Sequence, residues 1–315
     1  MNKALSIILL ATLAPLLAWA DPQVANPDAE DPTDAFVREN PAFSDPPATV
    51  SELPLLPADY SEYPFLDLQA NHLQMNGADW SALRGRFAMA HDTLISIVHI
   101  GDSHIQAEGS TSRTRRLLQE RYGSAGRGLI IPFRLAGTNQ PTDYLITSTS
   151  KFTVGKILKK PWPIEMGFTG IALQPVSRNY NFTITAKPVD EGPQPFEDIK
   201  IFGNGDMPAL TSACDANGMP LEAEAIDNGN GTFDIFLERA VETVELNFES
   251  RGEWQFYGFL LDNYTAGVQY HAIGNNGATY SSYNSIGSVG QGIEPLNPNL
   301  IIISMGTNEA FGKTT

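Results

Sequence analysis

Three short polar stretches of the chain carry groups that acyl transfer needs. Gly-Asp-Ser-His, residues 101–104, offers the hydroxyl of Ser103 as a nucleophile. Gly277 lets its backbone N–H approach a ligand without a Cβ in the way, and the side-chain amide of Asn308 is a further donor. A nucleophile and donors for the developing oxyanion are the parts of an acyl-transfer site. Singly, each stretch is also typical of an ordinary turn or helix cap.

Each of the three stretches follows an apolar run that is typical of a buried strand. These runs are LISIVHI before Ser103, GVQYHAIG before Gly277 and NLIIISM before Asn308. In parallel sheets, ligands bind outside the carboxyl ends of the strands. We therefore expect the three stretches to meet at one edge of a parallel sheet.

Helices are expected beside the first of these strands. A short helix over residues 80–91 leads into the strand, and a longer helix over residues 107–123 follows it. The spacing of Leu117 and Leu118 predicts that these two leucines face the core. Ser103 then lies at a strand-to-helix junction.

The middle of the chain, residues 141–262, has a different character. Runs such as VETVELNFES alternate apolar and polar residues, and turn residues such as NGNG separate the runs. This pattern predicts a β-sandwich inserted into an α/β domain.

The N-terminus has the pattern of a secretory signal peptide. Residues 1–20 combine Lys3, an apolar run of signal length and Ala-Trp-Ala before a cleavage point. Residues 21–60 are rich in proline and acids and predict a disordered tether. We expect an exported protein, periplasmic or secreted, with no membrane span after signal removal.

Composition excludes some classes of function. The 315-residue chain has a net charge of −16, which argues against nucleic acid as a partner. No His, Asp or Glu cluster has metal-ligand spacing, and the glycine-rich GSAGRGL lacks the end of a phosphate loop, so no metal or other cofactor is expected. The single cysteine, Cys214, has no intrachain disulfide partner, and no histidine pattern suggests that it is catalytic.

The three stretches resemble the sequence blocks of the SGNH, or GDSL-like, hydrolase superfamily. GDSH matches the first block, NNGAT the second and GTNE the third. GDSHIQAEG, AGRGLIIPFRLAGTN and YHAIGNNGATYSSYN are similar to bacterial exported peptidoglycan O-acetylesterases. The resemblance implies a flavodoxin-like α/β/α three-layer sandwich, formed by residues 61–140 and 263–315, with a carbohydrate-binding-module-like β-sandwich at 141–262.

The resemblance also implies roles for individual residues. Ser103 would be the nucleophile, Gly277 and Asn308 would complete the oxyanion hole, and Asp102 would hold the loop. The implied activity is a serine esterase that removes O-acetyl groups from a cell-envelope polysaccharide, probably peptidoglycan, through an acyl-enzyme. Two alternatives stay open: an O-acetyltransferase of the same fold, and a non-catalytic glycan-binding protein.

One departure from the superfamily concerns the general base. The catalytic Asp-x-x-His block does not occur after Asn308, so residues 1–315 are expected to be C-terminally truncated and almost inactive on their own. Among the internal histidines, His104 and His271 are the first candidates for a substitute base. We expect His271 and His99 to be core residues, and His104 to point away from Ser103.

Two further sets of residues are candidates for glycan contact. Arg127 and Arg134 are expected to be surface or loop-anchoring residues, with contact to an acidic glycan as the alternative. The aromatic residues of the expected sandwich are mostly core in such folds. Candidates among them for stacking on a sugar are Trp162, Phe168, Tyr180, Trp254 and Tyr257.

Overall fold

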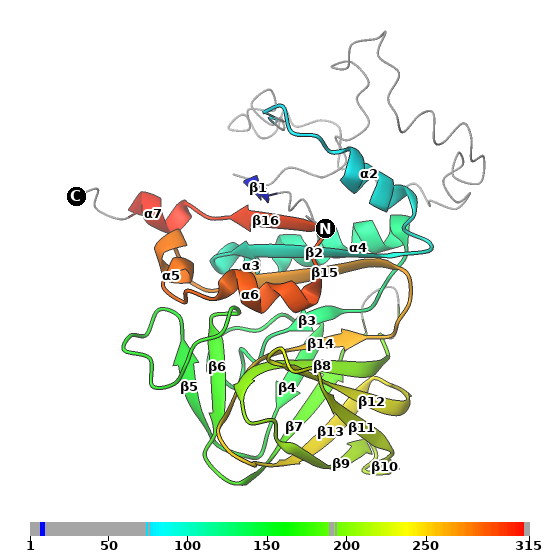
Figure 1. The fold of residues 1–315 in the computed structure, drawn as a ribbon, viewed down its shortest axis with the longest axis vertical. Coiled ribbons are helices and arrows are strands. Elements are labelled where there is room, and N and C mark those ends of the chain that lie inside the picture. Colours follow the sequence, from blue (N-terminus) through cyan, green and yellow to red (C-terminus); the bar gives the residue numbers. More distant parts are fainter. Residues whose placement is uncertain (1–6, 10–73, 75, 189–191, 193, 312–315) are drawn as a thin grey trace.

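A computed structural model describes residues 7–9, 74, 76–188, 192 and 194–311. The predicted tether and most of the predicted signal peptide therefore lie outside the described residues. Figure 1 shows two parts, a parallel sheet with its helices and a body of antiparallel strands. No helix among the described residues is long and apolar enough to cross a membrane.

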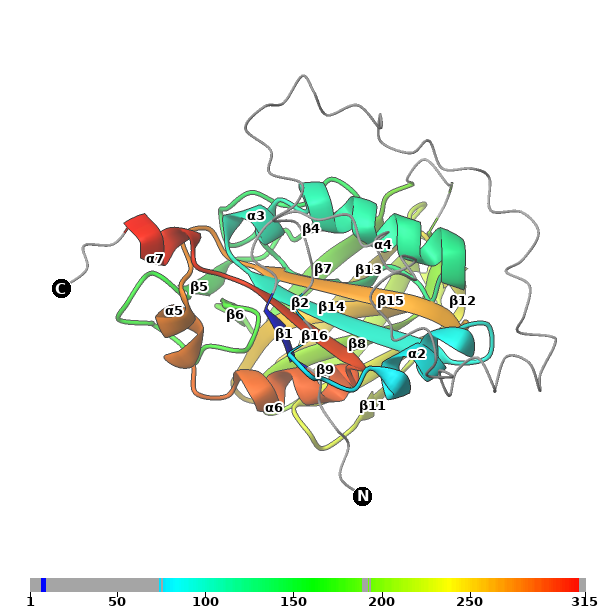
Figure 2. The ribbon, with the colours of Figure 1, turned by 90° about the horizontal axis from the view of Figure 1, so that it is seen from above.

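The parallel sheet has the strand order β1-β16-β2-β15. Gly101 at the end of β2 is level with Gly274 of β15 and with Ser304 of β16. The three strands therefore end together, and α3, α5 and α7 begin at the same edge (Figures 1 and 2). The strands are β1 (Ile7–Leu9), β2 (Leu94–Gly101), β15 (Gly267–Gly274) and β16 (Leu300–Ser304).

Different layers cover the two faces of this sheet. On one face, Ile95, Ile97 and Tyr270 pack with side chains of α2 and α4. On the other, Val98 and Ile273 pack with α5, α6, η3 and several residues of the antiparallel strands. The helices are α2 (Ser81–Ala88), α3 (Ser103–Gln106), α4 (Gly109–Tyr122), α5 (Tyr280–Asn284), α6 (Val289–Ile293), η3 (Glu294–Leu296) and α7 (Thr307–Phe311).

The antiparallel strands form two sheets, ordered β10-β9-β13-β7-β4 and β11-β12-β8-β14-β6-β5, with β3 pairing to β14. Buried residues of both sheets, such as Phe182 and Phe256, share one core. The strands are β3 (Gly128–Ile130), β4 (Tyr144–Thr147), β5 (Phe152–Lys156), β6 (Ile171–Pro175), β7 (Asn179–Ala186), β8 (Phe196–Gly205), β9 (Ala209–Asp215), β10 (Pro220–Leu221), β11 (Ala223–Asp227), β12 (Thr232–Val241), β13 (Thr243–Glu249) and β14 (Trp254–Asp262).

The structure bears out a mixed, sheet-rich α/β fold, although most of its strands are antiparallel. Two details differ from the sequence-based expectation. Strand β3 lies in the segment assigned to the α/β part but pairs with β14. The second face of the parallel sheet is covered partly by antiparallel strands, where a complete helical layer was expected.

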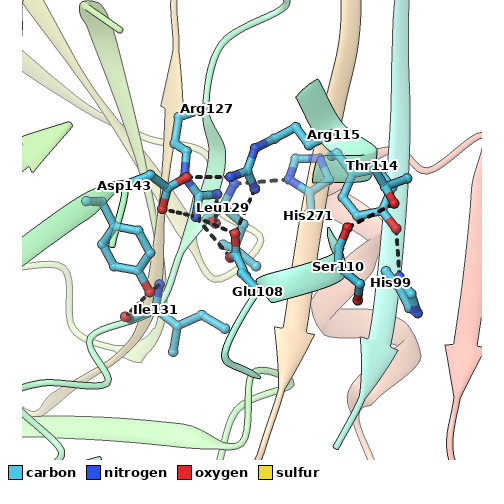
Figure 3. A network of polar contacts seen from close by, with 12 residues as sticks. His99, Glu108, Ser110, Thr114, Arg115, Arg127, Leu129, Ile131, Asp143 and His271 are labelled. Atoms are coloured by element: carbon cyan, nitrogen blue, oxygen red, sulfur yellow. Dashed lines mark hydrogen bonds and ion pairs between the residues drawn. The ribbon is translucent and has the colours of Figure 1, made fainter. Parts of the chain in front are cut away.

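A buried network of four charges joins the two parts (Figure 3). Arg127 is 2% exposed, and its Nη2 lies 2.9 Å from Glu108 Oε1 and 3.0 Å from Asp143 Oδ1. Arg115 of α4 pairs with the same two carboxylates. Burial alone would raise the pKa of Asp143, but Arg127 and Arg115 hold it below its usual value. Helix α4 is thereby tied to the chain just before β4.

Replacing Arg127 with Met should lower the free energy of unfolding by about 3–5 kcal/mol, because two buried carboxylates would then share one arginine. Urea unfolding followed by circular dichroism measures the change. Arg134→Met is the matched control, since Arg134 is exposed, and should stay within about 0.5 kcal/mol. Equal stability of the two variants would show that the network contributes nothing.

Candidate active site

Ser103 lies where β2 ends and α3 begins. Asp102 caps this helix, and its side chain accepts a hydrogen bond from the backbone N–H of His104 at 3.0 Å. The Ser103 side chain is half-buried, and its hydroxyl is hydrogen-bonded to no other group in the described part of the chain. The hydroxyl is thus not engaged by a structural contact.

Asp102 connects Ser103 with the end of β16. Asp102 is 2% exposed, and its carboxylate accepts a hydrogen bond from Asn308 Nδ2 at 3.3 Å. The same amide nitrogen donates to the carbonyl of Ala278 at 2.9 Å. Asn308 therefore contacts residues adjacent to both Ser103 and Gly277.

Gly277 is in the loop between β15 and α5 and has φ +79°, a conformation that side chains disfavour. A second contact holds this loop beside α7, because the backbone N–H of Tyr280 donates to Glu309 Oε1 at 2.7 Å. In the described residues, neither the Ser103 nor the Gly277 backbone N–H donates to another group. Both donors are available to a ligand.

Gln106 was not singled out from the sequence, yet it joins two loops at this edge. Its Oε1 accepts from the backbone N–H of Asn276 at 2.7 Å. Its Nε2 donates to Thr138 Oγ1 at 2.9 Å and to the carbonyl of Asn139 at 2.8 Å. In the sequence, only its position three residues after Ser103 could have drawn attention to Gln106, because its partners are distant along the chain.

A buried asparagine, Asn275, also holds the loop that carries Gly277. Asn275 Nδ2 donates to the carbonyl of Thr169 at 2.8 Å and to Tyr283 Oη at 3.0 Å. The Tyr283 hydroxyl donates to the carbonyl of Gly101 at 2.8 Å. The loop that carries Gly277 is thus fixed to the end of β2 and to the antiparallel strands.

The structure places His271 in the core, as expected. It is fully buried, and its Nδ1 accepts from the backbone N–H of Leu129 at 3.1 Å (Figure 3). Nε2 must then carry the proton, 3.2 Å from Ser96 Oγ. Burial, with Arg127 and Arg115 adding to it, lowers the pKa of His271 to about 3. Both ring nitrogens are engaged away from Ser103.

His99 is also a partnered histidine of the sheet. Its Nδ1 lies 2.6 Å from Tyr270 Oη and its Nε2 lies 2.7 Å from Ser304 Oγ. Burial lowers the pKa of His99 to about 4. It is half-buried on β2, and both of its ring nitrogens are engaged by structural contacts.

His104 differs from these two because its side chain is 66% exposed. Its Nδ1 lies 2.9 Å from Asp102 Oδ1, so the ring is turned toward the capping carboxylate. His91 is exposed, and His72 lies outside the described residues. In the described ranges, no three His, Cys, Asp or Glu side chains come together as a metal site.

The residues proposed for glycan contact fall into two groups. Arg127 is a buried anchor and Arg134 is a surface residue, the two positions expected for these arginines. Trp162 is the half-buried member of the aromatic set. The other four are buried: Phe168, Tyr180, Trp254 and Tyr257.

Cys214 is a free, half-buried thiol on β9.

Comparison with known proteins gives a match in structure. No protein-family model and no curated protein matches the chain. The solved structure "Peptidoglycan O-acetylesterase in action, 5 min" superposes with a TM-score of 0.56 and 20% sequence identity, over 77% of this chain and 64% of that one. The chain is similar in fold to a peptidoglycan O-acetylesterase. It spans slightly less than two thirds of that neighbour.

Two weaker matches involve carbohydrate-active proteins. "CpGH89CBM32-6 produced by Clostridium perfringens" matches 39% of this chain, is itself 95% covered, and has a TM-score of 0.26 and 13% identity. A GH87 α-1,3-glucanase catalytic unit from Streptomyces thermodiastaticus strain HF3-3 matches 38% of this chain and 26% of its own length, with a TM-score of 0.24 and 8% identity. These TM-scores support no conclusion about this chain.

The depressed pKa of His271 predicts a pH-dependent stability. Between the folded pKa of about 3 and the unfolded value near 6.5, unfolding takes up a proton at this side chain, so its contribution to stability is lost as pH falls. His271→Gln removes this dependence. The difference in unfolding free energy between this variant and the parent chain should therefore be about 2 kcal/mol smaller at pH 5 than at pH 7. The difference falls by about 1.4 kcal/mol for each pH unit below 6.5.

Urea unfolding at the two pH values measures this change. The comparison between variants is needed because Asp198, whose pKa burial raises to about 6, titrates in the same window with the opposite effect. Exposed His91→Gln is the control and should differ from the parent chain by the same amount at both pH values. A gap between His271→Gln and the parent that does not change with pH would contradict the prediction.

Proposed function

We propose that this chain carries the nucleophile and oxyanion hole of an SGNH-type serine esterase that acts on O-acetyl groups of a cell-envelope polysaccharide, with peptidoglycan as the favoured substrate. The observation that carries the proposal is the meeting of three strand ends. Asp102, next to Ser103, contacts Asn308, and Asn308 contacts Ala278, next to Gly277.

The order of the sheet supports a flavodoxin-like core. Counted along the chain, β2, β15 and β16 are its first, second and third strands apart from β1, and they lie in the order second, first, third. Flavodoxin-like sheets begin with this order and bind ligands where the first and third strands lie side by side. Ser103 follows β2 and Asn308 follows β16, so both are at that point.

The proposed reaction begins with attack of Ser103 Oγ on the acetyl carbonyl carbon. The oxyanion accepts hydrogen bonds from the backbone N–H groups of Ser103 and Gly277 and from Asn308 Nδ2. The 2.9 Å bond to Ala278 orients the Asn308 amide, and the longer 3.3 Å contact to Asp102 is the one exchanged for the oxyanion. The sugar alcohol leaves with a proton, and water then releases acetate from the serine ester.

A general base must accept the Ser103 proton in this scheme. Both ring nitrogens of half-buried His99 and of buried His271 are held by other groups, so neither histidine takes this role. In the SGNH superfamily, which this chain resembles, the base is the histidine of an Asp-x-x-His block. Residues 1–315 do not contain such a block. In the proposal, Asp102 is structural: it caps α3 and holds Asn308.

The choice of substrate rests on the fold neighbour and on the N-terminal pattern. The neighbour is a peptidoglycan O-acetylesterase. Residues 1–20 have the features of an export signal, which would place the enzyme in the compartment of the cell wall. The antiparallel strands would contribute glycan contacts beside the ester-cleaving site.

Ser103→Ala in the full-length gene product should abolish acetate release from O-acetylated peptidoglycan, by at least about 10³-fold, because the nucleophile is lost. Enzymatic assay of free acetate measures it. Ser110→Ala on α4 is the matched control and should retain full activity. Acetate release that survives Ser103→Ala contradicts the proposed nucleophile. A protein that binds peptidoglycan but releases no acetate in any form favours the non-catalytic alternative, and release that requires a sugar acceptor favours a transferase.

A further inference from the structure

A cationic segment lies beside the candidate active site. Lys156, Lys159 and Lys160 occur within five positions at the end of β5 and in the loop toward β6. The chain as a whole has a net charge of −16, with 20 lysines and arginines in total. The loop between β5 and β6 lies at the same edge as α5 and α7 in both views (Figures 1 and 2).

This loop touches the proposed oxyanion loop directly. A Cβ built on Gly277 would lie 2.9 Å from Leu158 Cδ1, so the leucine occupies the space next to that glycine. A cavity of about 280 Å³ opens here. It is lined by Ile157, Leu158, Lys160, Ser281 and Ser282. One wall of the cavity therefore comes from the cationic loop and the other from α5.

The lysines have no carboxylate partner among the described residues. Lys156 Nζ donates to the carbonyl of Gly137 at 3.2 Å, next to the loop that Gln106 holds. Its pKa is lowered by partial burial and by the positive charge of Lys159. Lys159 and Lys160 are exposed. Repulsion between the ammonium groups is therefore not compensated by an ion pair within this part of the protein.

A tryptophan holds one of the ammonium groups in position. Trp162 Nε1 donates to the carbonyl of Ile157 at 3.2 Å, which fixes the ring against the loop. Lys160 Nζ lies 4.7 Å from the centre of that ring, within the range of a cation–π interaction. The cation at the cavity is thus partly pre-organised, together with a half-buried aromatic face.

We infer that Lys160, with the neighbouring charge of Lys159 adding to the attraction, binds a carboxylate of the glycan next to the ester that Ser103 attacks. The identity of the ligand as an acetylated glycan rests on the proposed function. An anionic polymer is repelled by a protein of charge −16 unless a local cationic region attracts it. The lysine loop is such a region, and it borders the Gly277 loop. The carboxylate is either a lactyl group on the sugar or part of a peptide attached to it.

Isothermal titration calorimetry with three soluble oligosaccharides of equal length tests this binding. The first is a neutral N-acetylglucosamine oligomer. The second alternates N-acetylglucosamine with N-acetylmuramic acid bearing a free lactyl carboxylate, and the third carries peptide stems on the lactyl groups. Lys160→Gln should weaken binding of at least one anionic ligand about tenfold, as expected for loss of a charge-assisted hydrogen bond, and leave the neutral ligand unchanged.

Two control variants separate charge from packing. Lys160→Arg should retain most of the affinity, and Lys151→Gln, an exposed lysine before β5, should match the parent. Raising the salt concentration should weaken binding of the anionic ligand in the parent and have little effect on Lys160→Gln. An equal loss for neutral and anionic ligands, or no loss for either, would overturn the inference.

The binding titration and the acetate-release assay test the carboxylate site and the esterase proposal separately. Lysine-dependent binding without any Ser103-dependent acetate release would support the carboxylate site and overturn the esterase. Acetate release with no effect of Lys160→Gln on binding would do the reverse.

Discussion

Gly101, the last residue of β2, has no room for a side chain. A Cβ at this position would lie 2.3 Å from Ile105 Cγ1 and 2.8 Å from the carbonyl oxygen of Ser304. Gly274 is equally crowded, since a Cβ there would lie 2.1 Å from the backbone nitrogen of Gln106. These close approaches let α3 pack directly on the ends of β2 and β15, with the end of β16 against Gly101. Ser103, the Gly277 loop and Asn308 meet because the backbone there is packed this tightly.

The antiparallel strands support this edge and are not merely attached to it. The charge network of Arg127, Arg115, Glu108 and Asp143 ties α4 to the chain before β4. Thr169 lies in the segment between β5 and β6, and its carbonyl accepts from Asn275, next to the Gly277 loop. The loop that carries the lysines leaves the same pair of strands. The lysine loop, the Gly277 loop and the end of β2 are therefore held by one continuous set of contacts.

Local patterns in the sequence predicted much of this arrangement. The strand before Ser103, the helix over residues 80–91, the antiparallel middle and the common edge of the three polar stretches follow from periodicity and turn residues. The prediction for the helix after Ser103 holds in part. Leu118 is half-buried and packs against the core, but the fully buried residues of this helix are Thr111 and Arg115. Arg115 faces inward because it pairs with the buried carboxylates of Glu108 and Asp143. Such pairings, like those of Gln106 with Asn139 and Asn276, join distant parts of the chain and leave no local signal.

The central claim is that these strand ends form an oxyanion site around a nucleophilic Ser103. Covalent labelling of the full-length protein with a fluorophosphonate, followed by mass spectrometry of the peptides, tests it most directly, because the phosphonate oxygen occupies the position of the oxyanion. The account predicts one adduct, on Ser103, formed about 10²–10³-fold more slowly after Asn308→Ala. Labelling of a different residue, or a rate on Ser103 unchanged by Asn308→Ala, would contradict it.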